Sequence, residues 1–207
     1  TSSDWNTAQT VTVTGVNDGD LVDGDILTDI TISVDDQAEN TDSDFDDVAD
    51  QTVTVTTTDD DVAGFSISTT TLSMREDESR TFTVVLDKQP INSVRIVHTK
   101  PGGVTSAVAS PQFLTFTNTN WDTPQTITVT GQNDNRVDPD SSFTLTVSVD
   151  DSNSDNLFDN VADQTVNVSV TNIHTAGIII TPTTTLSVSE TATTATFQVK
   201  LQTLPYD

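Results

Sequence analysis

Acidic side chains gather in a short, glycine-containing segment near the start of the chain. The segment NDGDLVDGDILTD, residues 17–29, contains Asn17, Asp18, Asp20, Asp23 and Asp25. Carboxylates placed this close together repel one another unless solvent or a cation screens their charge. Two interpretations follow: the segment is a solvated turn that adds solubility, or it binds a cation.

Two further acidic clusters occur, and all three return later in the chain. The second cluster is Asp59, Asp60 and Asp61, and the third lies in residues 35–50. The later copies are Asn133, Asp134, Asp138 and Asp140 for the first cluster, Asn172 and His174 for the second, and residues 150–163 for the third. Recurrence at matching points favours cation binding over three unrelated solvated turns.

The types of the side chains select the ion. Calcium takes six to eight oxygen ligands with flexible geometry, whereas magnesium needs fewer carboxylates and more water. Zinc and copper prefer histidine or cysteine, but the chain has no cysteine, and its two histidines are far apart in sequence. The spacing of Asp42, Asp44 and Asp46 resembles the front of a calcium loop, but the central glycine and closing glutamate of an EF-hand are missing. The expected cofactor is therefore Ca²⁺.

The overall charge excludes several classes of partner. The 207 residues include 32 acidic and 7 basic ones, which gives a net charge of −25. Such a surface repels nucleic acid, because phosphate binding needs lysine and arginine. No apolar run approaches the ~20 residues of a membrane span, so we expect no membrane insertion of this segment. With 33% hydrophobic residues the chain can still form a packed core.

Long stretches of the sequence repeat with a period of about one domain. DWNTAQTVTVTGVND (residues 4–18) returns as NWDTPQTITVTGQND (120–134), and FDDVADQTVTV (45–55) returns as FDNVADQTVNV (158–168). The order of these landmarks predicts three parts: residues 1–62 are the C-terminal half of a preceding repeat, 63–175 are a complete repeat, and 176–207 are the N-terminal strands of the next. Neighbouring repeats of the same protein are then the expected partners.

Alternating hydrophobicity predicts an all-β fold. TFTVVL (81–86) places Phe82, Val84 and Leu86 on one face, and QTITVTG (125–131) does the same with Ile127 and Val129. No helical period is sustained. About seven such strands in one repeat, separated by Gly, Pro, Asp and Asn turns, predict tandem antiparallel Ig-like β-sandwich domains. In such a sandwich the first two acidic clusters can meet at the pole where the next repeat attaches.

Three segments resemble the Calx-β domain, the calcium-binding module of sodium/calcium exchangers and of many bacterial surface proteins. TVTVTTTDDDVAGFSIS (52–68) resembles the end of one such domain running into the next, and LSMREDESRTFTVVL (72–86) resembles the opening of the domain. LTFTNTNWDTPQTITVTGQNDNRVDPDSSFTLTVSVDD (114–151) resembles its central strand, acidic loop and strand. The chain departs from the family at HTKPGG, where Lys100 stands near the position of an expected acidic residue, and it lacks the usual GTA…DY signature.

The resemblance implies two sets of metal ligands. In the complete repeat they are Glu76, Asn133, Asp134, Asp138, Asp140 and Asn172. In the preceding repeat they are Asn17, Asp18, Asp23, Asp25, Asp59, Asp60 and Asp61, and Glu190 would begin a third set. The implied function is a non-catalytic, extracellular or cell-surface stalk, structural or adhesive, in which calcium at the junctions between repeats makes a tandem array rigid.

Other functions remain open on the sequence alone. The chain could be a filament subunit that shares strands between copies, because edge strands pair readily. It could also be a carbohydrate- or ice-binding adhesion module that uses the threonine rows Thr10, Thr12, Thr14 and Thr52, Thr54, Thr56. An enzyme is not expected, since no nucleophile elbow or phosphate-binding glycine loop occurs and the acidic loops offer no apolar pocket that would raise the pKa of a catalytic carboxyl group.

Overall fold

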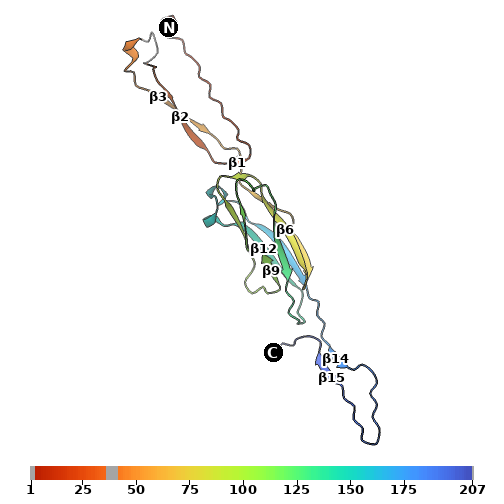
Figure 1. The fold of residues 1–207 in the computed structure, drawn as a ribbon. Coiled ribbons are helices and arrows are strands. Elements are labelled where there is room, and N and C mark those ends of the chain that lie inside the picture. Colours follow the sequence, from red (N-terminus) through yellow and green to blue (C-terminus); the bar gives the residue numbers. More distant parts are fainter. Residues whose placement is uncertain (1–2, 36–41, 207) are drawn as a thin grey trace.

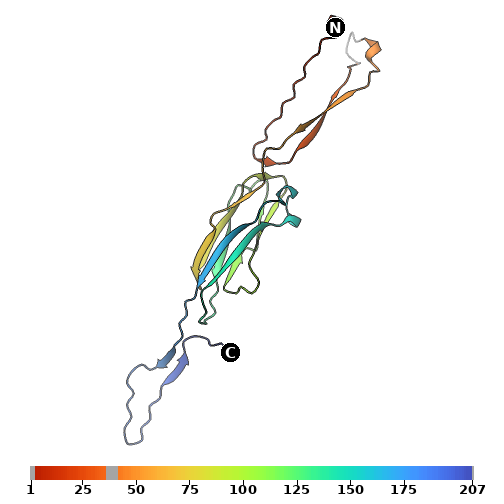
Figure 2. The ribbon, with the colours of Figure 1, turned by 180° about the vertical axis from the view of Figure 1, so that it is seen from behind.

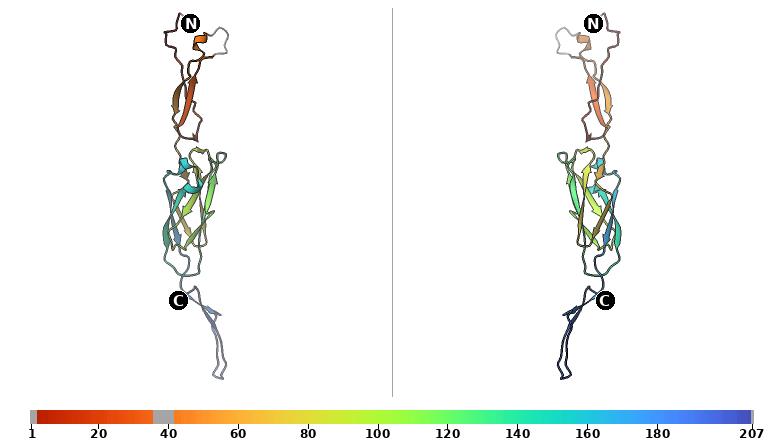
Figure 3. Two further views of the ribbon diagram at one scale, coloured as in Figure 1. Left: turned by 90° about the vertical axis from the view of Figure 1, so that its left-hand side faces the viewer. Right: turned by 90° about the vertical axis from the view of Figure 1, so that its right-hand side faces the viewer.

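The centre of the molecule is a two-sheet β-sandwich, with a two-stranded hairpin projecting from each end (Figure 1). The computed structural model describes residues 3–35 and 42–206. The same arrangement, three parts roughly in line, is seen from behind in Figure 2 and from the two sides in Figure 3. The all-β prediction is therefore confirmed; short 3₁₀ turns are the only helical elements among the described residues.

One sheet of the sandwich has five strands and the other has four. In spatial order, the first sheet consists of β10 (Phe113–Phe116), β8 (Val94–Thr99), β12 (Ser141–Val149), β13 (Gln164–Thr171) and β5 (Thr71–Arg75). The second consists of β4 (Phe65–Ile67), β6 (Ser79–Leu86), β11 (Gln125–Gly131) and β9 (Ala107–Ser110).

The core lies between these sheets and is built from the alternating residues. Phe82, Val84 and Leu86 of β6 are buried, as are Ile127 and Val129 of β11. The inner faces of β12 and β13 add Leu145, Val147, Val149, Val166, Val168 and Val170. Burial of one face of each strand is the main favourable contribution to such a fold, and the period-two pattern predicted which face it would be.

The sandwich has nine strands rather than about seven. The two additional strands are β5 and β9, which are short. β5 also pairs parallel with β13, with Thr171 opposite Arg75, while the other pairs in the two sheets are antiparallel. This pairing matters for the candidate site, because it leads the chain from Arg75 directly to the acidic loops.

The hairpins at the two ends reproduce pairings of the sandwich. β2 (Ile26–Ile32) pairs with β3 (Gln51–Thr57), and Ile26 lies opposite Thr57. In the β12–β13 pair, Ser141 lies opposite Val170. Ser141 comes 115 residues after Ile26 and Val170 comes 113 residues after Thr57, so the two pairs have the same register. β14 (Ile178–Thr181) pairs with β15 (Gln198–Leu201) in the register of β4 and β6. Equivalent sequences thus form equivalent pairs in different parts of the chain.

The threonine-rich run of residues 9–15 does not form a strand, although its copy at 125–131 is β11. β11 is held by hydrogen bonds to β6 on one side and β9 on the other. No described strand pairs with residues 9–15, and an extended segment becomes a strand only through such pairing. The same absence of packing partners leaves Trp5 exposed, whereas its copy Trp121 packs against the core.

A short parallel pair joins the first hairpin to the sandwich. β1 (Leu21–Val22) pairs with β7 (Gln89–Pro90), so that Leu21 lies opposite Gln89 and Val22 opposite Pro90. The remaining elements are 3₁₀ turns: η1 (Ser43–Phe45), η2 (Asp151–Asn153) and η3 (Asn156–Phe158). No helix of the described residues is long and apolar enough to cross a membrane.

Candidate metal centre

The first two acidic clusters meet between the first hairpin and the sandwich. Asp59 Oδ2 accepts hydrogen bonds from the backbone N–H groups of Asp23, at 3.1 Å, and Gly24, at 2.7 Å. The N–H of Asp59 in turn donates to Asp25 Oδ1 at 3.0 Å. Gly24 has a φ of +77°, a conformation that glycine adopts without strain. The loop 17–25 and the linker 59–61 therefore form one polar unit.

Three carboxylates of this unit lie close enough to share an ion. Oxygen atoms of Asp59, Asp60 and Asp61 lie within 4.8 Å of one another. The side chain of Asp61 is only 6% exposed, and its Oδ2 has no hydrogen-bond partner. A buried carboxylate oxygen without a donor is costly, and a cation beside it would remove that cost.

The pKa shifts in the first unit have opposite signs. Backbone N–H groups of Asp61, Gly24 and Asp23 stabilise the charged form of Asp59 and hold its pKa below the usual value. Partial burial, followed by the charges of Asp18 and Asp59, raises the pKa of Asp23. Asn17 Oδ1 accepts the N–H of Gly19 at 2.8 Å and shapes the start of the loop.

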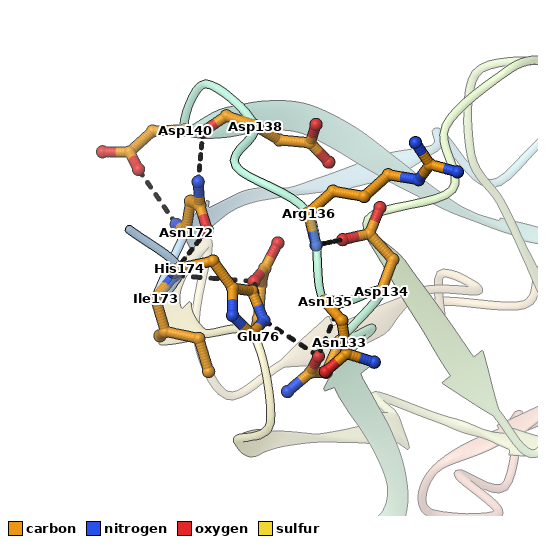
Figure 4. Close-up of polar contacts among 10 residues, drawn as sticks. All are labelled: Glu76, Asn133, Asp134, Asn135, Arg136, Asp138, Asp140, Asn172, Ile173 and His174. Atoms are coloured by element: carbon orange, nitrogen blue, oxygen red, sulfur yellow. Dashed lines mark hydrogen bonds and ion pairs between the residues drawn. The ribbon is translucent and has the colours of Figure 1, made fainter. Parts of the chain in front are cut away.

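A second group of carboxylates lies at the opposite end of the sandwich (Figure 4). Glu76, Asp134 and Asp138 have carboxylate oxygens within 4.8 Å of one another. Glu76 follows β5 and is 6% exposed, and its N–H donates to Thr171 O of β13 at 3.1 Å. Asp134 and Asp138 belong to the loop between β11 and β12, and all three side chains line one pocket together with Ser106 and Gln132.

Asp138 carries the least compensated charge of this second group. Its Oδ1 is buried without a hydrogen-bond partner. Partial burial, and next the charge of Asp134, raise the pKa of Asp138, and the charges of Arg136 and His174 oppose that rise. A divalent cation between the three carboxylates would relieve both desolvation and repulsion.

The other predicted residues of the complete repeat support the loops around these carboxylates. Asn172 donates its backbone N–H to Asp140 Oδ1 at 3.0 Å, and its side-chain amide donates to the carbonyl oxygen of Asp138. Asn133 Oδ1 accepts the N–H of Asn135 at 3.0 Å. These contacts place Asn133, Asp140 and Asn172 beside the group of Glu76, Asp134 and Asp138.

Three hydrogen bonds occur in the same form at both ends of the sandwich. The bond from Asp59 N–H to Asp25 corresponds to that from Asn172 N–H to Asp140. The bond from Asp61 N–H to Asp59 Oδ1 corresponds to that from His174 N–H to Asn172 Oδ1, both at 2.8 Å. In each unit an Asn side chain, Asn17 or Asn133, also closes the first turn. The two groups are therefore copies of one local structure.

Basic side chains border both groups, and the sequence pattern did not identify their roles. Lys88 Nζ lies 2.7 Å from Asp61 Oδ1 and from Asp20 Oδ1. His174 Nε2 lies 3.6 Å from Glu76 Oε2 and 3.0 Å from Asn133 Oδ1. Lys100, which stands at the departure from the family pattern, donates to the carbonyl oxygens of Val104 and Ala107 at 2.7 Å, so its charge is held by its own loop.

The third acidic cluster is used for local structure in the sandwich. Asp155 is buried, accepts the N–H of Asn92 at 2.8 Å and caps η3 through Leu157 N–H at 3.2 Å. Asp150 faces Arg95 at 3.4 Å. The earlier copy lies partly in residues 36–41, outside the described residues. Within the described ranges, only the two groups above bring three metal-binding side chains together.

The geometry of the two groups suits a hard divalent cation. Carboxylates on turns, amide side chains and backbone carbonyls are the ligands that calcium takes.

The two histidines make separate contacts. His98 contacts the carbonyl oxygen of Pro111 at 2.8 Å, and His174 contacts Glu76 and Asn133. The threonines of the row Thr52, Thr54 and Thr56 are exposed on β3, whereas Thr10, Thr12 and Thr14 lie outside any strand.

Comparisons with known proteins concern the fold. No protein-family model matches the chain, and no curated protein matches it. Similar solved structures include a complex described as "Chaperone-tip adhesin complex is vital for synergistic activation of CFA/I fimbriae biogenesis", with 11% identity and a TM-score of 0.40, over 56% of this chain and 62% of that chain. The E. coli chaperone DraB matches with 13% identity and a TM-score of 0.39, over 56% of this chain and 58% of that chain.

A third similar structure is the apo form of the Calx CBD1 domain. It is 14% identical with a TM-score of 0.39, and the match covers 54% of this chain and 98% of that domain. The chain thus spans less than two thirds of the adhesin-complex chain and of DraB, and nearly all of the CBD1 domain. The Ig-like β-sandwich of this protein rests on the strand order of the chain itself and not on these likenesses.

Proposed function

We propose that this protein is a non-catalytic, calcium-binding segment of a tandem-repeat stalk at a bacterial cell surface or in the extracellular medium. Its repeats are Calx-β-like, with residues 1–62 and 176–207 as parts of the repeats that flank the complete one, 63–175. The equal registers of β2–β3 and β12–β13, and of β14–β15 and β4–β6, support this division.

The observation that carries the proposal is the position of the two carboxylate groups. Asp59, Asp60 and Asp61 follow β3 of the first hairpin and precede β4 of the sandwich. Glu76, Asp134 and Asp138 lie beside Asn172 and His174, which lead from β13 of the sandwich to β14 of the second hairpin. Each group includes a buried carboxylate oxygen without a partner, in Asp61 and in Asp138. The predicted ligands Asn17, Asp18, Asp23, Asp25 and Asp60, and Asn133, Asp140 and Asn172, belong to the same two loop systems.

In this proposal calcium acts mechanically. Without it, carboxylates on the loop and on the linker repel one another, and a junction that no cationic side chain bridges bends easily. A bound ion replaces that repulsion by attraction to a common centre and restricts the hinge. Because the ion binds only the ordered arrangement, it also stabilises the folded repeat by mass action.

Calcium titration by isothermal calorimetry tests the binding. The chain is compared with the double variant Glu76→Gln/Asp138→Asn and the triple variant Asp59→Asn/Asp60→Asn/Asp61→Asn, and the exposed Asp122→Asn serves as the matched control. We expect saturable binding, with one set of sites lost in each multiple variant and none in the control. Absence of binding at millimolar calcium would make the clusters solubilising turns and refute the proposal.

Exposed apolar surface on the end hairpins supports a second candidate, a filament subunit that shares strands between copies. Val53 of β3 and Ile178 of β14 are 52% and 65% exposed, and Phe197 and Leu201 are also exposed. In the sandwich, the equivalent faces are covered by the opposite sheet. Light scattering over a concentration series distinguishes the candidates, because strand sharing predicts a mass that grows with concentration and a bare stalk segment predicts a monomer.

A further inference from the structure

The first junction is closed by an interface of defined geometry. The N–H of Gln89 donates to Asp20 O at 2.8 Å, next to the β1–β7 pair. Val22, which comes from the preceding repeat, is 4% exposed and belongs to the core cluster of the sandwich. The loop 20–25 therefore docks onto the next repeat through backbone bonds and one buried apolar side chain.

Lys88 connects the two acidic segments of this junction. It lies between β6 and β7 of the complete repeat. Its Nζ is 2.7 Å from Asp20 Oδ1, on the loop of the preceding repeat, and 2.7 Å from Asp61 Oδ1, on the linker. Hydrogen bonds to these two carboxylates raise the pKa of Lys88 above its usual value, so the ammonium group stays charged at neutral pH.

The second junction repeats the backbone contact but not the lysine. Leu204 N–H donates to Asn135 O at 2.8 Å, as Gln89 N–H does to Asp20 O. The segment LDKQP (86–90) has its copy in LQTLP (201–205), so Thr203 stands in place of Lys88. The cation here is Arg136, on the loop side, which donates to the carbonyl oxygen of Pro205 at 2.7 Å and lies 4.8 Å from the ring of Tyr206.

The two junctions therefore differ in how their negative charge is compensated. At the first, one ammonium group bridges carboxylates from both sides of the junction. At the second, the described ion pairs include none that bridges two carboxylates across the boundary. The carboxylates of Glu76, Asp134 and Asp138 remain close together with His174 as the neighbouring base.

We propose that Lys88 is a tethered counter-ion that keeps the first junction docked in the absence of a divalent cation. This inference rests on the proposed function and deepens it, because calcium then governs the stiffness of junctions that lack such a lysine. Lys88 offsets one of the two negative charges of Asp20 and Asp61, and it leaves Asp61 Oδ2, Asp59 and Asp60 available to a cation. A stalk with both kinds of junction bends at defined places when calcium is low.

Distance measurements between two spin labels test the inference. The chain has no cysteine, so Thr52→Cys on β3 and Thr126→Cys on β11, both exposed, give a clean labelled pair across the first junction. Double electron–electron resonance is recorded with a chelator and with calcium for the otherwise unchanged chain, Lys88→Met and Lys88→Arg. Lys200→Met, which removes one exposed positive charge elsewhere, is the control.

The expected result is a narrow distance distribution in chelator for the unchanged chain, Lys88→Arg and Lys200→Met, and a distribution at least twice as wide for Lys88→Met. If calcium narrows the distance distribution of Lys88→Met again, both the role of Lys88 and the role of calcium hold at this junction. If the distribution of Lys88→Met stays wide with calcium, the role of Lys88 holds and the proposed role of calcium fails at this junction. A narrow distribution for Lys88→Met in chelator, or a wide one for the unchanged chain, overturns the inference. Thermal unfolding followed by tryptophan fluorescence, in which the core-packed Trp121 reports the transition and the exposed Trp5 contributes a background, verifies that each variant is folded.

Discussion

The backbone N–H of Asp59 donates to the carboxylate of Asp25 at 3.0 Å, and the same bond joins Asn172 to Asp140 at the other end of the sandwich. In both places a residue one or two positions after a strand, β3 or β13, is held by the acidic loop that precedes the partner strand. The linker to the next repeat begins at this bond. Any ion held by the loop is therefore coupled directly to the direction in which the next repeat leaves.

Calcium should raise the thermal stability of the complete repeat, and Asp134→Asn/Asp138→Asn should reduce the effect by removing one of the two groups. At a free calcium concentration about 100-fold above the Kd, mass action adds about 2.7 kcal/mol to the free energy of unfolding. Magnesium should give a smaller shift, because it demands a tighter octahedral site. Thermal melts monitored by tryptophan fluorescence measure the shift; equal shifts in the variant and the unchanged chain would place the calcium effect elsewhere.

Val22→Ala should destabilise the sandwich, although the proposed division of the chain assigns Val22 to the preceding repeat. The substitution removes two methyl groups from a 4% exposed side chain in the core cluster, at a cost of about 1.5 to 2.5 kcal/mol. Val62→Ala, at a 78% exposed position nearby, should change stability little. Urea unfolding curves compare the two variants. Equal midpoints would mean that the docked loop contributes nothing to the stability of the next repeat.

Gly131→Ala should disturb both the sandwich and the second carboxylate group. A Cβ atom at Gly131 would lie 2.4 Å from Arg75 O and 3.2 Å from the Cα of Glu76. The backbone that carries Glu76 would have to shift, at a cost of about 1 to 3 kcal/mol. Gly102→Ala, which meets no atom within 4 Å, is the control. Denaturant unfolding gives the stability, and weaker calcium binding in Gly131→Ala alone should accompany the loss.

Stability without calcium should depend on pH through Asp138. Its pKa is raised in the folded state, so the charged form opposes folding above that pKa. As the pH falls through the folded pKa, protonation relieves this cost, and below the ordinary value of 3.8 the relief is complete. Asp138→Asn should therefore raise the melting temperature at pH 7 in chelator. Between pH 7 and pH 4, the melting temperature of this variant should rise less than that of the unchanged chain. A variant that melts lower than the unchanged chain in chelator would contradict this assignment.

Much of the fold could be predicted from alternation and repetition. The buried faces of β6, β11, β12 and β13 follow the period-two pattern, because every second side chain in these strands is hydrophobic and packs in the core. The pattern did not reveal β5 and β9, because short strands carry few alternations. Residues 9–15 share the alternating pattern of their copy β11, but a strand depends on partners that contribute hydrogen bonds, and no described strand pairs with this run.

The candidate site was predicted in part. Local composition marked the loops that carry Asp23, Asp59 and Asp138, and the sandwich topology implied that loop and linker meet. Glu76 was identified only through the family resemblance, because a single glutamate after a strand has no distinctive local signal. Local sequence also did not separate the third cluster from the other two, since a carboxylate that caps a turn, such as Asp155, looks the same in sequence as one that binds an ion.

The sequence by itself determined the strand faces, the period of the repeat and the presence of acidic loops at strand ends, because these depend on residues close together in the chain. Only the tertiary structure decided which carboxylates share one space and which cation compensates them. Lys88 and Asp20 are 68 residues apart, yet they are joined at 2.7 Å. That contact depends on how two repeats dock, through Val22 and the β1–β7 pair, and Coulomb interactions of this kind are strong only at distances that the docked chain sets.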